Sequence, residues 1–206
     1  MTSDPRSEPF FWVAVRRLRD SWVVVALLVV CALLALGGDE LRDLARYERQ
    51  AIENGEYWRL VSGHLVHLGF GHLWPNLAAT AIIGLLFEGV FRNADWVRVG
   101  AVSAAAIDLG LYALEPQVLW YVGLSGVLHG YVAAGALALL VRRDKLGVVL
   151  AIGVAAKLAF EQVAGPVPFT AESVGGPVVV AAHLYGVIGG LLAEAAVQAA
   201  RRRSRV

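Results

Sequence analysis

One serine in the sequence has the surroundings that a nucleophile needs. Ser125 lies in the stretch Gly123-Leu124-Ser125-Gly126, directly before an apolar run that ends at Arg142. The serine is therefore expected in the first turn of a helix, where unpaired backbone N–H groups and the helix dipole stabilise a developing negative charge. Small residues of this kind also pack between membrane helices, so the motif alone does not establish catalysis.

A serine hydroxyl needs a general base, and His183 is the candidate. Gly186 and Gly190 follow this histidine on one face of its expected helix, and Gly126 and Gly130 lie just below the serine on theirs. Glycine stripes let two helices approach closely, as contact between a serine and a histidine requires. We expect a dyad without a third carboxylate, because no acid lies near enough in the sequence. A core histidine bonded to a backbone carbonyl is the alternative.

Two further polar residues are candidates for binding an oxyanion. His72 and Asn76 are four residues apart, so both side chains project from one face of a helix. Their N–H groups, with the backbone N–H of the serine, have the chemistry to hold the oxygen of a tetrahedral intermediate. His64, His67 and His72 also suggest zinc, but they lack a carboxylate or thiolate companion. We expect no metal and no cofactor.

Other polar residues interrupt the apolar runs. His129 lies one turn after the serine and has three candidate roles: contacting substrate, relaying a proton or bonding to a neighbouring helix. Lys157 and Glu161 are four residues apart, so they can neutralise each other inside a bilayer. Substrate recognition is the alternative for this pair. Asp108 has no obvious partner in the sequence.

The composition indicates which kind of structural element positions these residues. The chain has 206 residues, of which 58% are hydrophobic and 17% charged, so it is an integral membrane protein of one domain, residues 1–206. This length suits an all-α bundle of six transmembrane helices of about 20 residues each. The expected spans are 22–37, 72–87, 96–114, 125–141, 146–163 and 178–200.

The segments outside the spans predict the orientation. They are a leader at 1–20, a long outer loop at 38–71 and a basic tail at 201–206. Lysine and arginine residues are concentrated on the side that holds both termini, which predicts that both are cytoplasmic. The first span resembles a signal peptide but lacks a persuasive cleavage site, so we expect it to be retained. The tail is a topology anchor rather than a nucleic-acid site, and the single Cys31 excludes an internal disulfide.

Three of the candidate residues agree in depth. At about 1.5 Å per helical residue, Ser125, His183 and His72 each lie about 24–27 Å from the charged residue that ends its span. In a hydrocarbon core of about 30 Å, all three would share one level near the outer face. Residues that serve only packing would not be expected to agree in this way, so the agreement favours a site.

The chain resembles the rhomboid intramembrane serine proteases in four motifs, which occur in this order: Trp58-Arg59, His72-x-x-x-Asn76, Gly123-x-Ser125-Gly126 and His183-x-x-Gly186-x-x-x-Gly190. The resemblance implies a six-span fold, a catalytic serine–histidine dyad and an oxyanion site at the first histidine and the asparagine. It also implies that Trp58 and Arg59 belong to a loop lying on the membrane, and that Glu88 is structural. A single-pass substrate in the lipid bilayer would be cut just inside the outer surface.

A narrower resemblance is to the rhombosortases, a bacterial branch of that family. It depends on GLSGVLHG, on Lys157 with Glu161-Gln162, and on AHLYGVIGGLL around His183. It implies a protein of the bacterial inner membrane whose site opens to the periplasm, and substrates anchored by a C-terminal Gly-Gly motif, apolar helix and basic tail. A catalytically silent rhomboid-like binding or chaperone protein is the first alternative, and a small transporter is the second.

Overall fold

The structure is a computed structural model that describes residues 21–168 and 175–203 of the chain. The expected leader at 1–20 and positions 204–206 of the tail lie outside the described residues. The long helices are α2 (Trp22–Ala35), α6 (Phe70–Leu86), α7 (Asn93–Leu114), α8 (Ser125–Val141), α9 (Lys145–Ala164) and α11 (Val180–Arg203). The short elements are α3 (Gly38–Ala45), β1 (Tyr47–Glu48), α4 (Arg49–Glu53), α5 (Arg59–Ser62) and β2 (Trp120–Tyr121).

Each predicted span is a helix in the structure, which confirms a helical bundle for the described part of the chain. Among the described residues, α7, α9 and α11 are long and apolar enough to cross a membrane. The pair α2 and α3 would add a fourth span only if it crosses while bent by 119°. Helices α6 and α8 are apolar but have 17 residues each, or about 25 Å. The count of six spans therefore stays a prediction.

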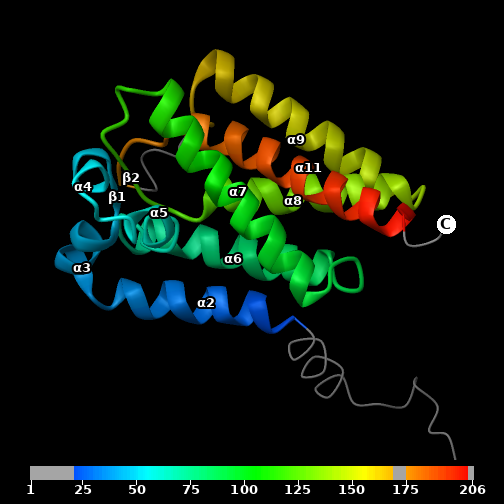
Figure 1. The fold of residues 1–206 in the computed structure, drawn as a ribbon, viewed down its shortest axis with the longest axis horizontal. Helices are drawn as coiled ribbons and strands as arrows, with labels where there is room; N and C mark the ends of the chain where they lie inside the picture. Colours follow the sequence, from blue (N-terminus) through cyan, green and yellow to red (C-terminus); the bar gives the residue numbers. More distant parts are fainter. Residues whose placement is uncertain (1–20, 169–174, 204–206) are drawn as a thin grey trace, which may run out of the picture.

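The short elements gather at one end of the bundle, opposite the C-terminal end of α11 (Figure 1). There β1 and β2 pair as a two-stranded antiparallel sheet, the one departure from an all-helical fold among the described residues. The Arg49 guanidinium donates to the carbonyl oxygens of Leu111 and Glu115 at 2.7 and 3.0 Å. These bonds satisfy carbonyl groups at the end of α7 and fix the first loop to the bundle.

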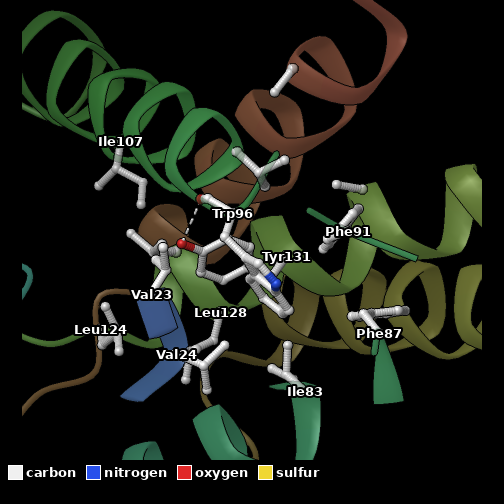
Figure 2. Packing of buried hydrophobic residues seen from close by; sticks show 14 of the residues in the cluster. Val23, Val24, Ile83, Phe87, Phe91, Trp96, Ile107, Leu124, Leu128 and Tyr131 are labelled. Atoms are coloured by element: carbon white, nitrogen blue, oxygen red, sulfur yellow. Dashed lines mark hydrogen bonds between the residues drawn. The ribbon is translucent and has the colours of Figure 1, made fainter. Parts of the chain in front are cut away.

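The apolar core joins α2, α6, α7 and α8 (Figure 2). Trp96 of α7 packs edge to face on Tyr131 of α8, with ring centres 4.8 Å apart. The Tyr131 hydroxyl donates to the Trp96 carbonyl oxygen at 3.0 Å, so this buried polar atom is satisfied. Val24 of α2 and Ile83 of α6 belong to the same cluster, which ties the first helix to the rest of the bundle.

Helix α8 is mostly buried, and glycine residues allow α11 to pack closely against it. A Cβ at Gly186 would collide with the carbonyl oxygen of Gly126, and a Cβ at Gly190 would collide with that of Gly130. The two backbones therefore touch along one stripe, as the glycine spacing predicted. Any larger residue in this stripe would force the helices apart.

Candidate active site

Ser125 begins α8, and the turn before it requires glycine. Gly123 has a φ of +117°, and a Cβ at this position would lie 2.6 Å from the His72 ring. The Gly123 amide donates to the Gly63 carbonyl oxygen at 3.0 Å, and the Tyr121 hydroxyl donates to the Gly123 carbonyl oxygen at 2.6 Å. The turn is thus held at both its amide and its carbonyl, and it fixes the start of the helix.

His183 lies in the first turn of α11, and its ring meets the serine. The His183 Nε2 atom is 3.1 Å from the Ser125 Oγ atom, which is hydrogen-bond distance. His183 is buried, whereas Ser125 is half-buried and opens to a cleft. The contact follows from the glycine stripe, because Ser125 precedes Gly126 and His183 lies one turn before Gly186. The structure therefore brings together the two residues that the sequence paired.

A carboxylate also lies beside the histidine. The Glu161 Oε2 atom is 2.9 Å from the His183 Nδ1 atom, on the ring nitrogen that does not face Ser125. The expectation of a dyad without a third carboxylate is therefore wrong. Glu161 comes from α9, 22 positions earlier in the chain, and only the packing of α9 beside α11 brings the two together. The one signal in the sequence was an acid inside an apolar run, which indicates a functional site in a membrane helix.

Lys157 contacts the other oxygen of the same carboxylate. Its Nζ atom pairs with the Glu161 Oε1 atom, one helical turn away, in line with the four-residue spacing. The Lys157 side chain is 38% exposed, whereas that of Glu161 is 2% exposed. The lysine thus neutralises the buried carboxylate from the side of the cleft, and it leaves the second oxygen to the histidine.

His129 stacks on the histidine of α11, and in the described part of the chain its hydrogen bond is to its own helix rather than to a neighbouring one. Its Nδ1 atom is 2.7 Å from the Ser125 carbonyl oxygen of its own helix. The His129 and His183 rings lie 4.1 Å apart at 18°. Together with Glu161, these residues are the one group of potential metal ligands in the described part of the chain. Because the rings are nearly parallel, their nitrogen lone pairs lie in separate planes, which does not fit one shared ion.

His72 and Asn76 face the same cleft, which has a volume of about 790 Å³ and is lined by residues of α6, α8, α9 and α11. The Leu68 amide donates to the His72 Nδ1 atom at 3.5 Å, so the neutral ring carries its proton on Nε2. One N–H of Asn76 donates to the His72 carbonyl oxygen at 2.8 Å, and the second N–H is not used there. Both side chains thus keep a donor and line the cleft that Ser125 also lines.

A smaller cavity of about 280 Å³ approaches the serine from the β2 side. It is lined by His72 and Ser125, by Trp120 and Tyr121 of β2, and by Val178 before α11. Burial raises the pKa of Tyr121, so its hydroxyl stays protonated and continues to hold the turn before α8. The serine is therefore accessible both from between the helices and from the end of the bundle.

The other motif residues lie outside both cavities. The buried Arg59 donates to the carbonyl oxygens of Asp43 and Arg46 at 2.9 and 3.0 Å, and it thereby braces the first loop. Trp58 is exposed beside it. Glu88 lies half-buried in the turn between α6 and α7. These positions are consistent with support of the fold and are remote from the serine–histidine contact.

The remaining histidines, His64 and His67, have separate surroundings. The His64 Nε2 atom is 3.2 Å from the Asp108 Oδ1 atom, and this buried pair gives Asp108 a partner that lies 44 positions away in the sequence. Neither ring nitrogen of His67 has a hydrogen-bond partner among the described residues. Burial, with a smaller contribution from His72, lowers the pKa of His67 to about 3, so this ring is neutral. Within the described residues, these histidines belong to no group of three potential ligands.

Comparison with known proteins adds to this geometry. Residues 54–199 match the family model described as the Rhomboid domain. The chain is 29% identical over 163 residues to the putative rhomboid protease YdcA of Bacillus subtilis, which covers 79% of this chain and 78% of that protein. It is 40% identical over 98 residues to RHOMBOID-like protein 5 of Arabidopsis thaliana, covering 46% of this chain and 31% of that protein. It is 29% identical over 119 residues to the rhomboid protease GlpG of Haemophilus influenzae, covering 53% of this chain and 60% of that protein.

Proposed function

The chain belongs to the rhomboid family of intramembrane serine proteases, and we propose that Ser125 and His183 carry its hydrolase activity. The observation that carries this proposal is the 3.1 Å contact between Ser125 Oγ and His183 Nε2. The residues come from separate helices, whose backbones touch at the level of the site. A nucleophile and a base at this distance meet the geometric requirement for acyl transfer.

The reaction proceeds through an acyl-enzyme. Ser125 Oγ attacks the scissile carbonyl carbon while His183 Nε2 takes the hydroxyl proton, and the histidine then gives that proton to the leaving amine. Water next loses a proton to His183 and attacks the ester carbonyl, which releases the new carboxyl group and restores the serine. Each step needs only the one proton that moves between the imidazole and the reacting atoms.

The oxyanion of each tetrahedral intermediate is held by three kinds of donor. The start of α8 offers unpaired backbone N–H groups, including that of Ser125. His72 and Asn76 of α6 line the same cleft as Ser125, and each is proposed to supply a side-chain N–H there. Preorganised donors of this kind each contribute about 10²–10³ in rate, because they need no reorganisation when charge develops.

The proposed substrate is a single-pass membrane protein that enters through the cleft between α6 and α9. The lining is mostly apolar, with side chains such as Val132, Val149 and Leu150, which suits a lipid-soluble helix. The peptide bond to be cut must leave its helix to reach the serine. Glycine disfavours helix by about 1 kcal/mol relative to alanine, so a Gly-Gly sequence would unwind readily.

We place this chain in the rhombosortase branch of the family, in the bacterial inner membrane with both termini in the cytoplasm. Its motifs around Ser125, Lys157 and His183 support the branch. Arg142, after α8, and the arginines that end α11 lie about 25 Å or more from the serine and histidine along their helices. With the basic ends in the cytoplasm, the site would open to the periplasm.

A catalytically silent binding or chaperone protein is the alternative. Such a protein would keep the bundle but would not need the contact between Ser125 and His183, so the intact contact favours the enzyme. A transporter would also place polar side chains in its helices, but it would keep its flux after loss of the serine hydroxyl.

Cleavage in cells tests the proposal. The protein is co-expressed with a reporter that ends in a Gly-Gly motif, an apolar helix and a basic tail, and mass spectrometry identifies the new carboxyl terminus. We expect cleavage near the glycines, loss of product with Ser125→Ala and His183→Ala, and normal cleavage with Ser103→Ala. Ser103 is the matched control because its buried hydroxyl has no hydrogen-bond partner in the part of the chain that the structure describes. Cleavage that persists in Ser125→Ala would contradict the proposal.

A further inference from the structure

Glu161 has a second role that pairing with Lys157 does not explain. We propose that it is a positioning residue of the protease reaction, which holds His183 in the tautomer and orientation that the serine needs. The working unit would then be a Ser125–His183–Glu161 triad. This inference rests on the proposed function, because it assumes that His183 is the base.

The two ring nitrogens of His183 have different partners. Nε2 faces the Ser125 hydroxyl at 3.1 Å, and Nδ1 faces the Glu161 carboxylate at 2.9 Å. An ionised carboxylate only accepts hydrogen bonds, so the proton of the neutral ring must be on Nδ1. Nε2 then carries the lone pair and accepts the serine proton. Without the carboxylate, the ring is free to put its proton on Nε2, where it cannot act as a base.

The burial pattern of α9 supports this role. Gly147 and Glu161 are the only buried residues of this 20-residue helix, whose other side chains are half-buried or exposed. A helix that contributes a single buried side chain to its neighbours would place an apolar residue there if packing were the only requirement. A carboxylate in this position needs a partner inside the bundle, and His183 is that partner.

Lys157 allows the buried Glu161 carboxylate to stay charged, and it does so without occupying the oxygen that contacts His183. It pairs with Oε1, whereas the histidine contacts Oε2, so the two partners do not compete for one oxygen. The oxygen that Lys157 leaves free is the one that contacts His183, so the ion pair and the histidine contact coexist on one carboxylate. When the imidazole becomes positive during the reaction, the same oxygen stabilises it.

His129 restricts the orientation of the His183 ring from one of its faces. Its ring lies parallel to that of His183 at 4.1 Å, and its Nδ1 atom is bonded to the Ser125 carbonyl oxygen. Stacking restricts tilting of the base but does not choose between its two tautomers. The choice of tautomer is therefore assigned to Glu161 alone.

The test compares four variants in purified full-length protein, with kcat and KM measured on the Gly-Gly reporter. Glu161→Gln should lower kcat by about 10²–10⁴-fold with KM changed less than about threefold, because loss of the orienting acid in a serine–histidine pair has effects of this size. Glu161→Asp, which keeps a carboxylate, should have a kcat at least tenfold higher than that of Glu161→Gln. Lys157→Met should retain kcat within about tenfold, since it removes the ion pair but keeps the contact with His183. Val163→Ala, at an exposed position of α9 outside the motifs, is the matched control and should equal the wild type.

Folding is checked by the melting temperature of each variant. If Glu161→Gln does not fold because Lys157 loses its partner, the double variant Lys157→Met with Glu161→Gln carries no unpaired charge and replaces it. A kcat within threefold of wild type for the folded variant would overturn the inference, provided that Ser125→Ala and His183→Ala are inactive. Activity in those two variants would instead overturn the proposed function.

Discussion

Gly126→Ala gives the sharpest test of how the helix contact sets the site. A Cβ at this position would lie 2.8 Å from the Ala182 carbonyl oxygen, whereas ordinary contact begins at 3.4 Å. The new Cβ atom and the Ala182 carbonyl oxygen are both fixed by their helix backbones, so neither can rotate away. The two helices must therefore separate by about 0.6 Å. Ser125 and His183 are the neighbours of these two residues. The same movement would stretch their 3.1 Å contact to about 3.7 Å, beyond hydrogen-bond length.

We expect this variant to react with a fluorophosphonate about 10–100-fold more slowly than the wild type, because misplacement by about 1 Å can cost about 10²-fold. Overpacking should also lower the free energy of unfolding by about 1–3 kcal/mol. The control is Gly153→Ala in α9, where a Cβ has no heavy atom within 4 Å. It should label at the wild-type rate. Wild-type labelling by a folded Gly126→Ala protein would refute the view that this backbone contact aligns the pair.

Three other predictions concern separate parts of the molecule. Asn76→Ala should lower kcat about 10²-fold with little change in KM, as measured on the reporter, because it removes an oxyanion donor; an unchanged kcat would exclude that role. Arg59→Lys should lower the free energy of unfolding by about 1–3 kcal/mol while kcat per folded molecule stays constant, because a single ammonium nitrogen cannot replace both the Nη1 bonds to the two carbonyl oxygens and the Nε contact with Glu56; a loss of kcat without a loss of stability would contradict this. The pKa of His67 is about 3 in the folded protein against an ordinary 6.5, so the folded state loses about 1.4 kcal/mol per pH unit as the pH falls below 6.5. His67→Leu should remove that part of the acid sensitivity in unfolding experiments, and an unchanged slope would show that His67 does not cause it.

The sequence predicted the parts of the fold that follow from local pattern. Apolar runs ended by charges located the long helices to within a few residues, and α8 matches its expected range of 125–141. The two-stranded sheet at the end of the bundle was not predicted. Strands β1 and β2 have two residues each, and they form because distant parts of the chain pair, not because their residues have a strong preference for strand. The division of 38–71 into α3, α4 and α5 was also missed, because its mixed charges show no clear period.

The site divides in the same way. Ser125 and His183 were paired from glycine spacing and depth, because a helix converts spacing directly into position. Glu161 and Asp108 were not assigned their histidine partners, since those contacts join segments far apart in the chain, and the sequence does not determine how these segments pack. Equal depth could have indicated the first contact: Glu161 lies near the C-terminal end of α9, and His183 lies near the N-terminal end of α11, where the two helices meet.

The most direct test of the central claim is covalent labelling of the purified protein by a fluorophosphonate, with the modified residue identified by mass spectrometry. The account predicts one modified residue, Ser125, no labelling in Ser125→Ala, and labelling slowed by at least about 10²-fold in His183→Ala. Ser103→Ala should label as the wild type does. Labelling at another serine, or full-rate labelling in folded His183→Ala, would contradict the claim that these two residues form the nucleophile and its base.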